Sequence, residues 1–300
     1  GHACHLIERE PQAGGALRYV TPAFRMDRAA LEETVEEIRA AGVRFVFGRA
    51  LGKDFTIEQL KADGYEGVFL AIGAEKAAET PGATDARTFL GRANEGAMAM
   101  DGSVLVAGDG PDAIDAARTA LRLGAKKAAV LLSGGLPARS GLQEQAALAA
   151  EEGVRFLENA ALVEATAGGA DILLGGVTVR YPCDRVIAAD TARVDEGALG
   201  GIAVERGGIK AAAATGETGA PGVFAGGDAV RRGSVIAAIA SAKRAAAAMD
   251  RLIRGKNAVL SGIPPVQTVD RERVLRRSGY IKKNESQIRL VPREPQERKR

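Results

Sequence analysis

Apolar positions along the chain fall into short continuous runs that alternate with longer segments of helical spacing. The runs predict buried strands, because a strand covered on both faces of a sheet needs no polar alternation. In the helical segments apolar residues recur every three or four positions, as at Leu31, Val35 and Ile38. Strands that alternate with helices predict an α/β fold with parallel sheets covered on both faces.

The expected elements can be placed along the chain from this pattern and from the Gly and Pro residues that interrupt it. Strands are predicted at Ala3–Glu8, 43–48, 68–72, 104–107, 128–132, 154–157 and 183–190, with a hairpin at 170–182 and a short strand before Gly226. Helices are predicted at 27–42 with Asp27 as the N-cap, and at 54–64, 112–123, 143–152 and 234–253. Residues 11–26, with Pro and paired Gly, are predicted to form a loop.

The segment VLVAGDGPDAIDAARTALRLGA, residues 104–125, has the pattern of a dinucleotide-binding turn between a strand and a helix. Gly108 makes the turn, Gly110 lets the backbone approach a pyrophosphate, and Ala113 lets the helix pack on the strand. The helix N-terminus then offers N–H groups and partial positive charge to phosphates. Asp109 and Asp112 oppose an anion there, so a nucleotide fold kept for its architecture, with weak or no binding, remains an alternative.

A second such fold is indicated by the start of the chain, where a strand ends at Glu8 and a loop with Gly14 and Gly15 follows. Glu8 is placed to hold a ribose 2′-OH from the strand end. A strand–GxGxxG–helix unit is expected before it, so we expect the chain to begin inside a domain. Asp228 follows two glycines after an apolar strand, where it can accept hydrogen bonds from cofactor hydroxyls. Its alternative role is that of a helix N-terminal acid favoured by the dipole.

Composition narrows the choice of protein class. The chain has 300 residues, 46% hydrophobic and 26% charged, which suits two globular domains. No apolar run approaches the roughly 18 residues of a membrane span, and no leader is recognisable, so a cytoplasmic location is expected.

The two cysteines, Cys4 and Cys183, form no CxxC motif. A metal site with His2 and His5 is not expected, since i and i+3 lie on opposite faces of a strand.

Charge is concentrated at the end of the chain, where residues 271–300 carry 11 Lys or Arg against 4 Glu. This segment is predicted to be a tail or a partner-docking segment, with a solvated terminus as the alternative. Tyr280 is its only aromatic residue, and no nucleic-acid motif accompanies it, so nucleic acid is not an expected partner.

Several of these motifs together resemble the glutamate synthase small subunit and its relatives, the flavin-dependent pyridine-nucleotide oxidoreductases. The resemblance runs from about His2 to Leu252 and rests on the order of the motifs. They are GGALRYVTPAFRMDRAALEETVEEIRAAGVRFVFG, VFLAIGA, GDGPDAIDAARTALRLGA, PCDRVI and GVFAGGDAV followed by SVIAAIASAKRAA. The segment VDRERVLRRSGYIKKN also looks like a connector in members that continue into ferredoxin-like iron–sulfur modules.

The resemblance implies two Rossmann-like, three-layer dinucleotide-binding domains. FAD is then expected in a discontinuous domain of residues 1–97 and 216–256. NAD(P)H is expected in an inserted domain of residues 98–215. Residues 257–300 are expected to form a basic connector or tail. For FAD it implies contacts from Glu8, Gly14, Gly15, Leu17, Arg18, Gly73, Gly227, Asp228, Ser234 and Val235. For NAD(P)H it implies Gly108, Gly110, Pro111, Asp112 and Ala113.

The reaction implied is hydride transfer from NAD(P)H to FAD, with electrons passed to an iron–sulfur or ferredoxin-like partner in a hetero-complex. The cofactors carry this chemistry, so no catalytic side chain is expected.

This sequence departs from the family pattern in three places. The first GxGxxG unit is absent, Ser133-Gly134-Gly135 replaces the usual Arg-Arg, and VIAADT stands where an Ala-Ile-Gly-Gln-like turn is expected. Arg139, a few residues on, could serve a 2′-phosphate. A shortened chain, a partial gene product or a degenerate subunit would each explain the departures. The alternative function is therefore a non-catalytic, flavoprotein-derived scaffold subunit. A dehydrogenase of a small substrate is disfavoured because no catalytic His, Tyr–Lys or metal constellation is present.

Overall fold

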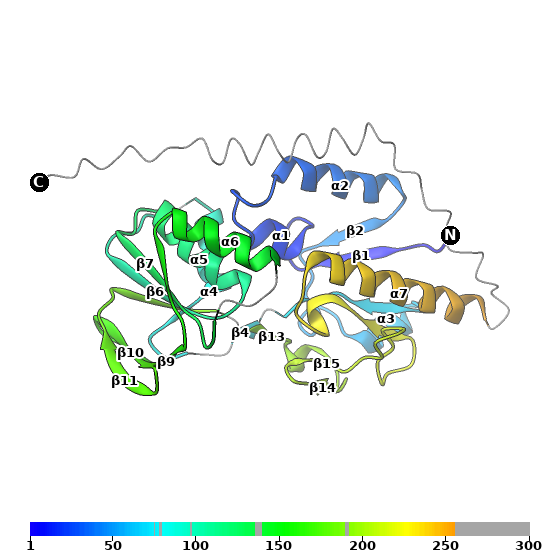
Figure 1. Cartoon of the computed structure of the whole chain (residues 1–300). Helices are drawn as coiled ribbons and strands as arrows, with labels where there is room; N and C mark the ends of the chain where they lie inside the picture. Colours follow the sequence, from blue (N-terminus) through cyan, green and yellow to red (C-terminus); the bar gives the residue numbers. More distant parts are fainter. Residues whose placement is uncertain (75, 78–79, 97, 136–139, 190–191, 256–300) are drawn as a thin grey trace, which may run out of the picture. The chain divides into compact units, whose positions relative to one another are not determined.

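The computed structural model describes residues 1–74, 76–77, 80–96, 98–135, 140–189 and 192–255 (Figure 1). Residues Gly1–Ile253 form one compact unit, and the chain from Arg254 belongs to a second. The predicted connector 257–300 and Arg139 lie outside the described residues. In the described part of the chain, no helix combines the length and apolarity needed to cross a membrane.

A five-stranded parallel sheet is the largest sheet of the described chain, with the strand order β5-β12-β6-β7-β8. Its strands are β5 Thr84–Asp85, β12 Arg185–Ala188, β6 Ser103–Ala107, β7 Lys127–Leu131 and β8 Val154–Leu157. Both faces of its central strands are buried, which explains the continuous apolar runs that predicted them.

Three helices cover one face of this sheet: α4 Ala86–Asn94, α5 Pro111–Arg122 and α6 Ser140–Glu151. Helix α5 contacts both α4 and α6 (Figure 1), and nine consecutive residues, Ala113–Leu121, are buried. Four of these nine residues are alanines, so the helix approaches the strands closely. The core between them joins Val106 and Val130 of the sheet to Ile114 and Phe89 of the helices.

A three-stranded antiparallel sheet covers the other face, with the order β11-β10-β9. Its strands are β9 Ala160–Thr166, β10 Gly169–Leu174 and β11 Val177–Tyr181. The predicted hairpin is confirmed as β10–β11, and β9 is an additional strand. Cys183 lies in the core between the two sheets with 5% exposure, and burial raises the pKa of its thiol. It is thus a packed core residue.

A second core is built from segments at opposite ends of the described chain. Two parallel pairs contribute strands, β1 His5–Glu8 with β2 Arg44–Phe47 and β3 Val68–Leu70 with β16 Val223–Ala225. The cluster around β3 and β16 includes Ile57 of α3 and packs against Ile7 of β1. The helices of this part are α2 Arg28–Ala40, α3 Ile57–Ala62 and α7 Val235–Arg254, and the hairpin β14 Val204–Glu205 with β15 Gly208–Ile209 also belongs to it.

Local sequence accounts for how these helices begin. The Asp27 side chain accepts a hydrogen bond from the Ala29 amide, so the predicted N-cap of α2 is confirmed. Thr56 and Gln59 exchange side-chain to backbone hydrogen bonds in a capping box at the start of α3.

Two predictions about the N-terminal segment are wrong. The first strand begins at His5 and is half-exposed instead of buried, because in the described part of the chain it pairs only with β2. The expected loop contains the short helix α1 Gly15–Tyr19. The predicted helix is confirmed as α2, on which Leu31 and Val35 are buried and Ile38 is 39% exposed. Apolar side chains alone do not show whether a neighbouring element covers them.

The chain passes twice between the two cores, at β4 Lys76–Ala77 and β13 Ala192–Arg193, which pair antiparallel. Residues 86–94 pack with the five-stranded sheet, whereas Val194, Leu199 and Ile209 pack with the second core. The division into two nucleotide-binding domains stays a prediction. These clusters favour domain boundaries near residues 80 and 190, whereas the family resemblance implied boundaries at 97/98 and 215/216.

Candidate cofactor sites

The turn at Gly108–Ala113 joins β6 to α5 and is tied to the neighbouring strand. Gly108 has φ +154°, a backbone conformation that favours glycine, and its N–H donates to the Leu131 carbonyl at 3.2 Å. Gly110 is the N-cap of α5 with extended backbone and no side-chain cap, and Pro111 follows in the first turn. Ala113 is fully buried. The turn therefore has the strand–turn–helix geometry, with a helix N-terminus not blocked by a side-chain cap, that suits phosphate.

The two carboxylates of this turn each have a partner. Asp109 accepts hydrogen bonds from the Ser133 amide at 2.8 Å and the Ser133 hydroxyl at 2.6 Å. Asp112 forms an ion pair with Arg232 at 2.9 Å. The positive charge of Arg232 compensates part of the negative charge that opposed an anion at this helix terminus.

Helix α5 is also held by the N-terminal segment. Arg25 Nη1 lies 2.6 Å from the Asp115 carboxylate, whose side chain is only 6% exposed. Burial raises the pKa of Asp115, and the nearby Arg25 guanidinium opposes that rise. The Phe24 ring lies under two guanidinium groups, with Arg118 Cζ 4.6 Å and Arg122 Cζ 4.3 Å from its centroid. These contacts couple the loop after α1 to the helix that carries the turn.

The predicted residues Gly73, Gly227 and Asp228 lie at one edge of the second core. Leu70 of β3 is in register with Ala225 of β16, so the segments that follow these two parallel strands leave at the same edge. Gly73 has φ +67° and Gly227 has φ +62°. The Asp228 carboxylate accepts a hydrogen bond from the Gly233 amide at 3.1 Å, which holds the loop that leads to α7.

Helix α7 begins beside this edge. The Ser234 hydroxyl accepts a hydrogen bond from the Ala237 amide at 3.2 Å and so caps the helix. The Gly227 amide donates to the Ser241 hydroxyl at 2.8 Å, which ties the turn to α7. Val235 and Ile236 are 51% and 80% exposed. An exposed apolar surface therefore adjoins the Gly227–Asp228 turn.

The remaining predicted residues lie in the N-terminal segment. Glu8 is half-buried, and its carboxylate accepts a hydrogen bond from the Glu10 amide at 3.1 Å. Gly14 has φ +129°, and a Cβ there would lie 3.1 Å from Leu31 Cδ2, so the close approach of α1 to α2 requires glycine. Gly15, with φ +49°, starts α1.

Leu17 and Arg18 follow on α1. Leu17 is half-buried. The Arg18 guanidinium bonds to the Ala13 carbonyl and to the Gln12 and Glu32 side chains. The hydrogen bond between Arg18 and Glu32 raises the pKa of Arg18 and lowers the pKa of Glu32. All three partners of Arg18 belong to the N-terminal segment, so its contacts order that segment.

Sequence reasoning missed the side chains that meet the predicted residues from distant segments. Arg232, Arg25 and Ser241 were not singled out, and Ser133 was noted only as a departure from the family pattern. The sequence around these residues gives little indication of their role, because each one contacts a residue that lies far along the chain or after a neighbouring strand.

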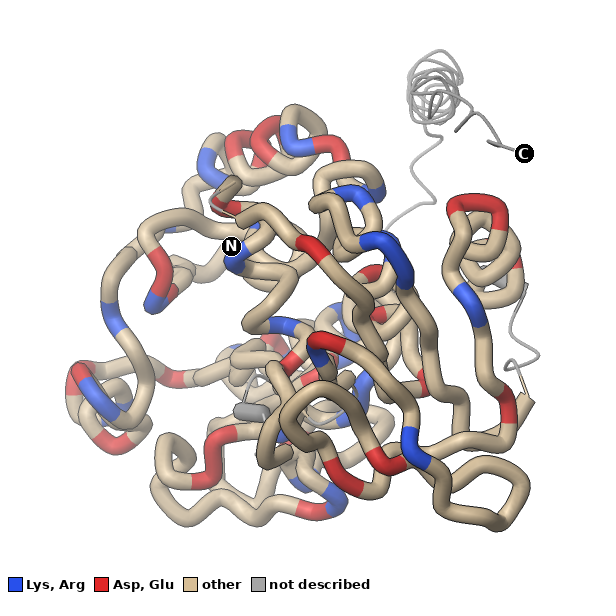
Figure 2. The backbone as a smooth tube through the Cα atoms, turned by 90° about the vertical axis from the view of Figure 1, so that its left-hand side faces the viewer, with Lys and Arg blue, Asp and Glu red and all other residues tan. Residues whose placement is uncertain are grey.

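Charges outside the sites give no single-sign face in the view of Figure 2, where Lys and Arg are interspersed with Asp and Glu along the described chain. The described residues contain no group of three His, Cys, Asp or Glu placed to hold a metal ion. His2 instead bonds to Asp250 at 2.7 Å, and His5 bonds to the Tyr65 hydroxyl.

The fold and the Gly108–Ala113 turn define an α/β protein of the dinucleotide-binding class. The chain belongs to the pyridine nucleotide-disulphide oxidoreductase family, whose model matches residues 7–248.

Two curated relatives show the extent of the similarity. The β subunit of the NADP⁺-dependent formate dehydrogenase of Moorella thermoacetica is 30% identical over 290 residues, which cover 85% of this chain and 41% of that protein. The glutamate synthase [NADPH] small chain of Halomonas elongata is 30% identical over 172 residues, 51% of this chain and 36% of that protein. The chain thus spans less than half the length of these relatives. The family resemblance inferred from the motifs is confirmed.

Solved structures confirm the fold class. The thioredoxin reductase of Lactococcus lactis superposes with a TM-score of 0.64 at 18% identity, over 84% of this chain and 91% of that one. FprA of Mycobacterium tuberculosis in complex with NADPH superposes with a TM-score of 0.63 at 15% identity, over 95% of this chain and 84% of that one. At these identities the likeness concerns the fold alone.

Proposed function

We propose that this chain is the nucleotide-binding part of a flavin-dependent oxidoreductase that transfers hydride from NAD(P)H to FAD. The observation that carries the proposal is the Gly108–Ala113 turn at the end of β6 in a member of this family. When bound, NAD(P)H supplies a hydride and FAD accepts it. The role of this chain is to bind the two cofactors and orient them.

The NAD(P)H turn fits a pyrophosphate by its backbone and by its charge. Gly110 presents no side chain at the N-terminus of α5, and Arg232 lies against Asp112 at the same terminus. Ser133, two residues after β7, donates hydrogen bonds to both oxygens of Asp109 and so holds that carboxylate in place. These contacts support phosphate binding at the turn and leave the choice between NADH and NADPH to experiment.

The edge formed after β3 and β16 fits FAD by three features. Gly73 and Gly227 allow a close backbone approach, Asp228 offers a carboxylate to cofactor hydroxyls, and α7 starts there. The exposed apolar side chains of Val235 and Ile236 are suited to lie against an aromatic ring system. Glu8, at the end of β1, supplies the acid expected for the adenosine ribose, since Ile7 beside it packs against the same core. Gly14, Gly15, Leu17 and Arg18 complete the proposed FAD set.

An electron acceptor with an iron–sulfur cluster, within a hetero-complex, is part of the proposal. It is supported by relatives that are subunits of named assemblies, a formate dehydrogenase and a glutamate synthase. The cytoplasmic location stays a prediction.

The experiment is anaerobic addition of NADH or NADPH to the purified flavin-containing protein, followed by absorbance. Reduction bleaches the yellow flavin band. Gly110→Ala is the sharpest variant, because alanine also adopts the extended backbone of this residue, and a methyl group at the helix N-terminus hinders the close approach of a pyrophosphate to the backbone. We expect it to lower the reduction rate at limiting nucleotide about tenfold, with flavin content unchanged.

Gly219→Ala is the matched control, since a Cβ there meets nothing within 4 Å. It should reduce at the rate of the parent protein. A protein that neither carries nor takes up FAD, or whose flavin keeps its colour with both nucleotides, would refute the proposal and support the non-catalytic scaffold instead.

A further inference from the structure

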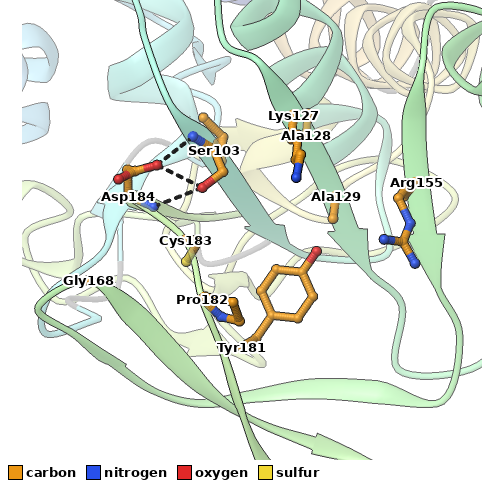
Figure 3. A pocket seen from close by; sticks show the side chains of 11 residues that line it. Ser103, Lys127, Ala128, Ala129, Arg155, Gly168, Tyr181, Pro182, Cys183 and Asp184 are labelled. Carbon is orange, nitrogen blue, oxygen red and sulfur yellow. Dashed lines mark hydrogen bonds between the residues drawn. The ribbon is translucent and has the colours of Figure 1, made fainter. Parts of the chain in front are cut away.

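A cavity of about 480 Å³ opens at the end of the five-stranded sheet opposite the Gly108 turn (Figure 3). It lies where β6, β7 and β8 begin, whereas the turn follows the end of β6. Its walls come from both layers, the parallel sheet on one side and the end of β11 on the other. Pro182, Cys183 and Ala129 give it an apolar lining.

Strand register explains which side chains face this cavity. Ala129 is in register with Arg155, and Lys127 precedes Ala129 by two positions, so all three lie on one face of the sheet. That face is the one covered by β9–β11, because Ala129 packs in the core between the layers. Tyr181 is in register with the buried Ala170 and so faces the same space from the opposite layer. Figure 3 shows the Lys127 ammonium and the Tyr181 hydroxyl directed toward each other.

The polar groups of the cavity have an unbalanced charge. In the part of the chain that the structure describes, the side chains of Lys127 and Arg155 have no ion-pair or hydrogen-bond partner, nor does the Tyr181 hydroxyl. Asp184 is the one carboxylate among the lining residues, and it accepts hydrogen bonds from the Ser103 amide and hydroxyl, both at 2.7 Å. Figure 3 shows it at the opposite end of the cavity from Arg155.

We propose that this cavity binds a small organic anion, in which a carboxylate or a phosphate is attached to a compact apolar body. Lys127 and Arg155 bind the anionic group, and the Tyr181 hydroxyl donates a hydrogen bond to it. The apolar walls hold the body of the ligand, as in most small-molecule sites, where a few polar groups converge in an apolar pocket of this size. The site is separate from the Gly108 turn, so it does not depend on the proposed hydride transfer.

The test is a titration of the full chain, labelled at alanine methyl groups, with phenyl phosphate in one arm and benzoate in the other. A saturable shift of the Ala129 methyl signal, which lies on the cavity face of the sheet, is expected in at least one arm, and the arm that saturates identifies the anionic group. Lys127→Gln and Arg155→Gln are each expected to weaken binding about tenfold, the loss typical of one charge-assisted hydrogen bond.

Lys126→Gln is the matched control. It removes one positive charge from the adjacent residue, but the Lys126 ammonium pairs with Asp101 at 2.9 Å and does not line the cavity. The Lys126→Gln variant should bind the probe anion with the affinity of the parent protein. Three results would overturn the proposal: no saturable shift in either arm, an equal loss of affinity in Lys126→Gln, or shifts at the Ala113 methyl instead of Ala129.

Discussion

The ion pair between Arg25 and Asp115 offers a sharp test of how the N-terminal segment holds α5. Arg25→Met removes the cation and keeps a side chain of similar length. Asp115 then remains in the core with 6% side-chain exposure and no charge partner from that segment. One of its oxygens, Oδ1, already lacks a hydrogen-bond partner in the described structure.

The expected loss of stability in Arg25→Met follows from the burial of the Arg25–Asp115 ion pair. Removing one partner of a buried ion pair costs about 3 to 5 kcal/mol, and the lower end applies here because Arg25 is itself 27% exposed. With a urea m-value of about 3 kcal/mol/M for a chain of this size, the unfolding midpoint falls by about 1 M. The double variant Arg25→Met with Asp115→Leu should recover most of this loss, since no buried charge remains.

The pH dependence has a defined sign. Burial raises the folded-state pKa of Asp115, so the folded protein binds the proton more tightly than the unfolded chain. The cost of ionising Asp115 is absent below the unfolded pKa and complete above the folded pKa. Arg25→Met raises the folded pKa further, because it removes the attraction that lowers it. The stability gap between variant and parent is therefore larger at about pH 8 than at about pH 5.

Urea unfolding of both proteins at the two pH values is the assay. Arg39→Met is the control, because Arg39 pairs with Glu36 on the surface, where the side chains are 50% and 66% exposed. The free energy of unfolding of Arg39→Met should fall by less than about 0.5 kcal/mol at either pH. A loss in Arg25→Met no greater than in Arg39→Met, or one that does not change with pH, would refute the account of this pair.

Further predictions concern the turn and the second core. Arg232→Gln removes the positive charge that pairs with Asp112 and should raise the KM for the nucleotide about fivefold, whereas Arg231→Gln should leave it unchanged. Steady-state reduction kinetics measure this difference. Gly208→Ala places a Cβ 2.3 Å from a backbone carbonyl oxygen and should lower the stability by about 2 kcal/mol, while Gly219→Ala, where nothing is near, should be neutral in urea unfolding. Thr56→Ala removes the α3 cap and should lower the unfolding midpoint by an amount equivalent to about 1 kcal/mol; an unchanged midpoint would count against the cap.

Local pattern was sufficient where neighbours in the sequence decide the structure. The spacing of Leu31 and Val35 and the N-cap Asp27 predicted α2, and the Gly108–Gly110–Ala113 spacing predicted a strand–turn–helix unit. Helix α1 was missed because it has only five residues and follows paired glycines, which favour a loop.

The sequence by itself determined the α/β class, the order of most elements and the backbone chemistry of the Gly108 turn. These depend on side-chain periodicity and on what glycine permits, which are properties of residues a few positions apart. The tertiary structure alone decided which side chains meet. Arg232 reaches Asp112 from 120 positions away, and Ser133 meets Asp109 only because β6 and β7 are neighbours in the sheet. It also decided that β1 is half-exposed and that Lys127 and Arg155 share a cavity, since burial depends on which elements pack together.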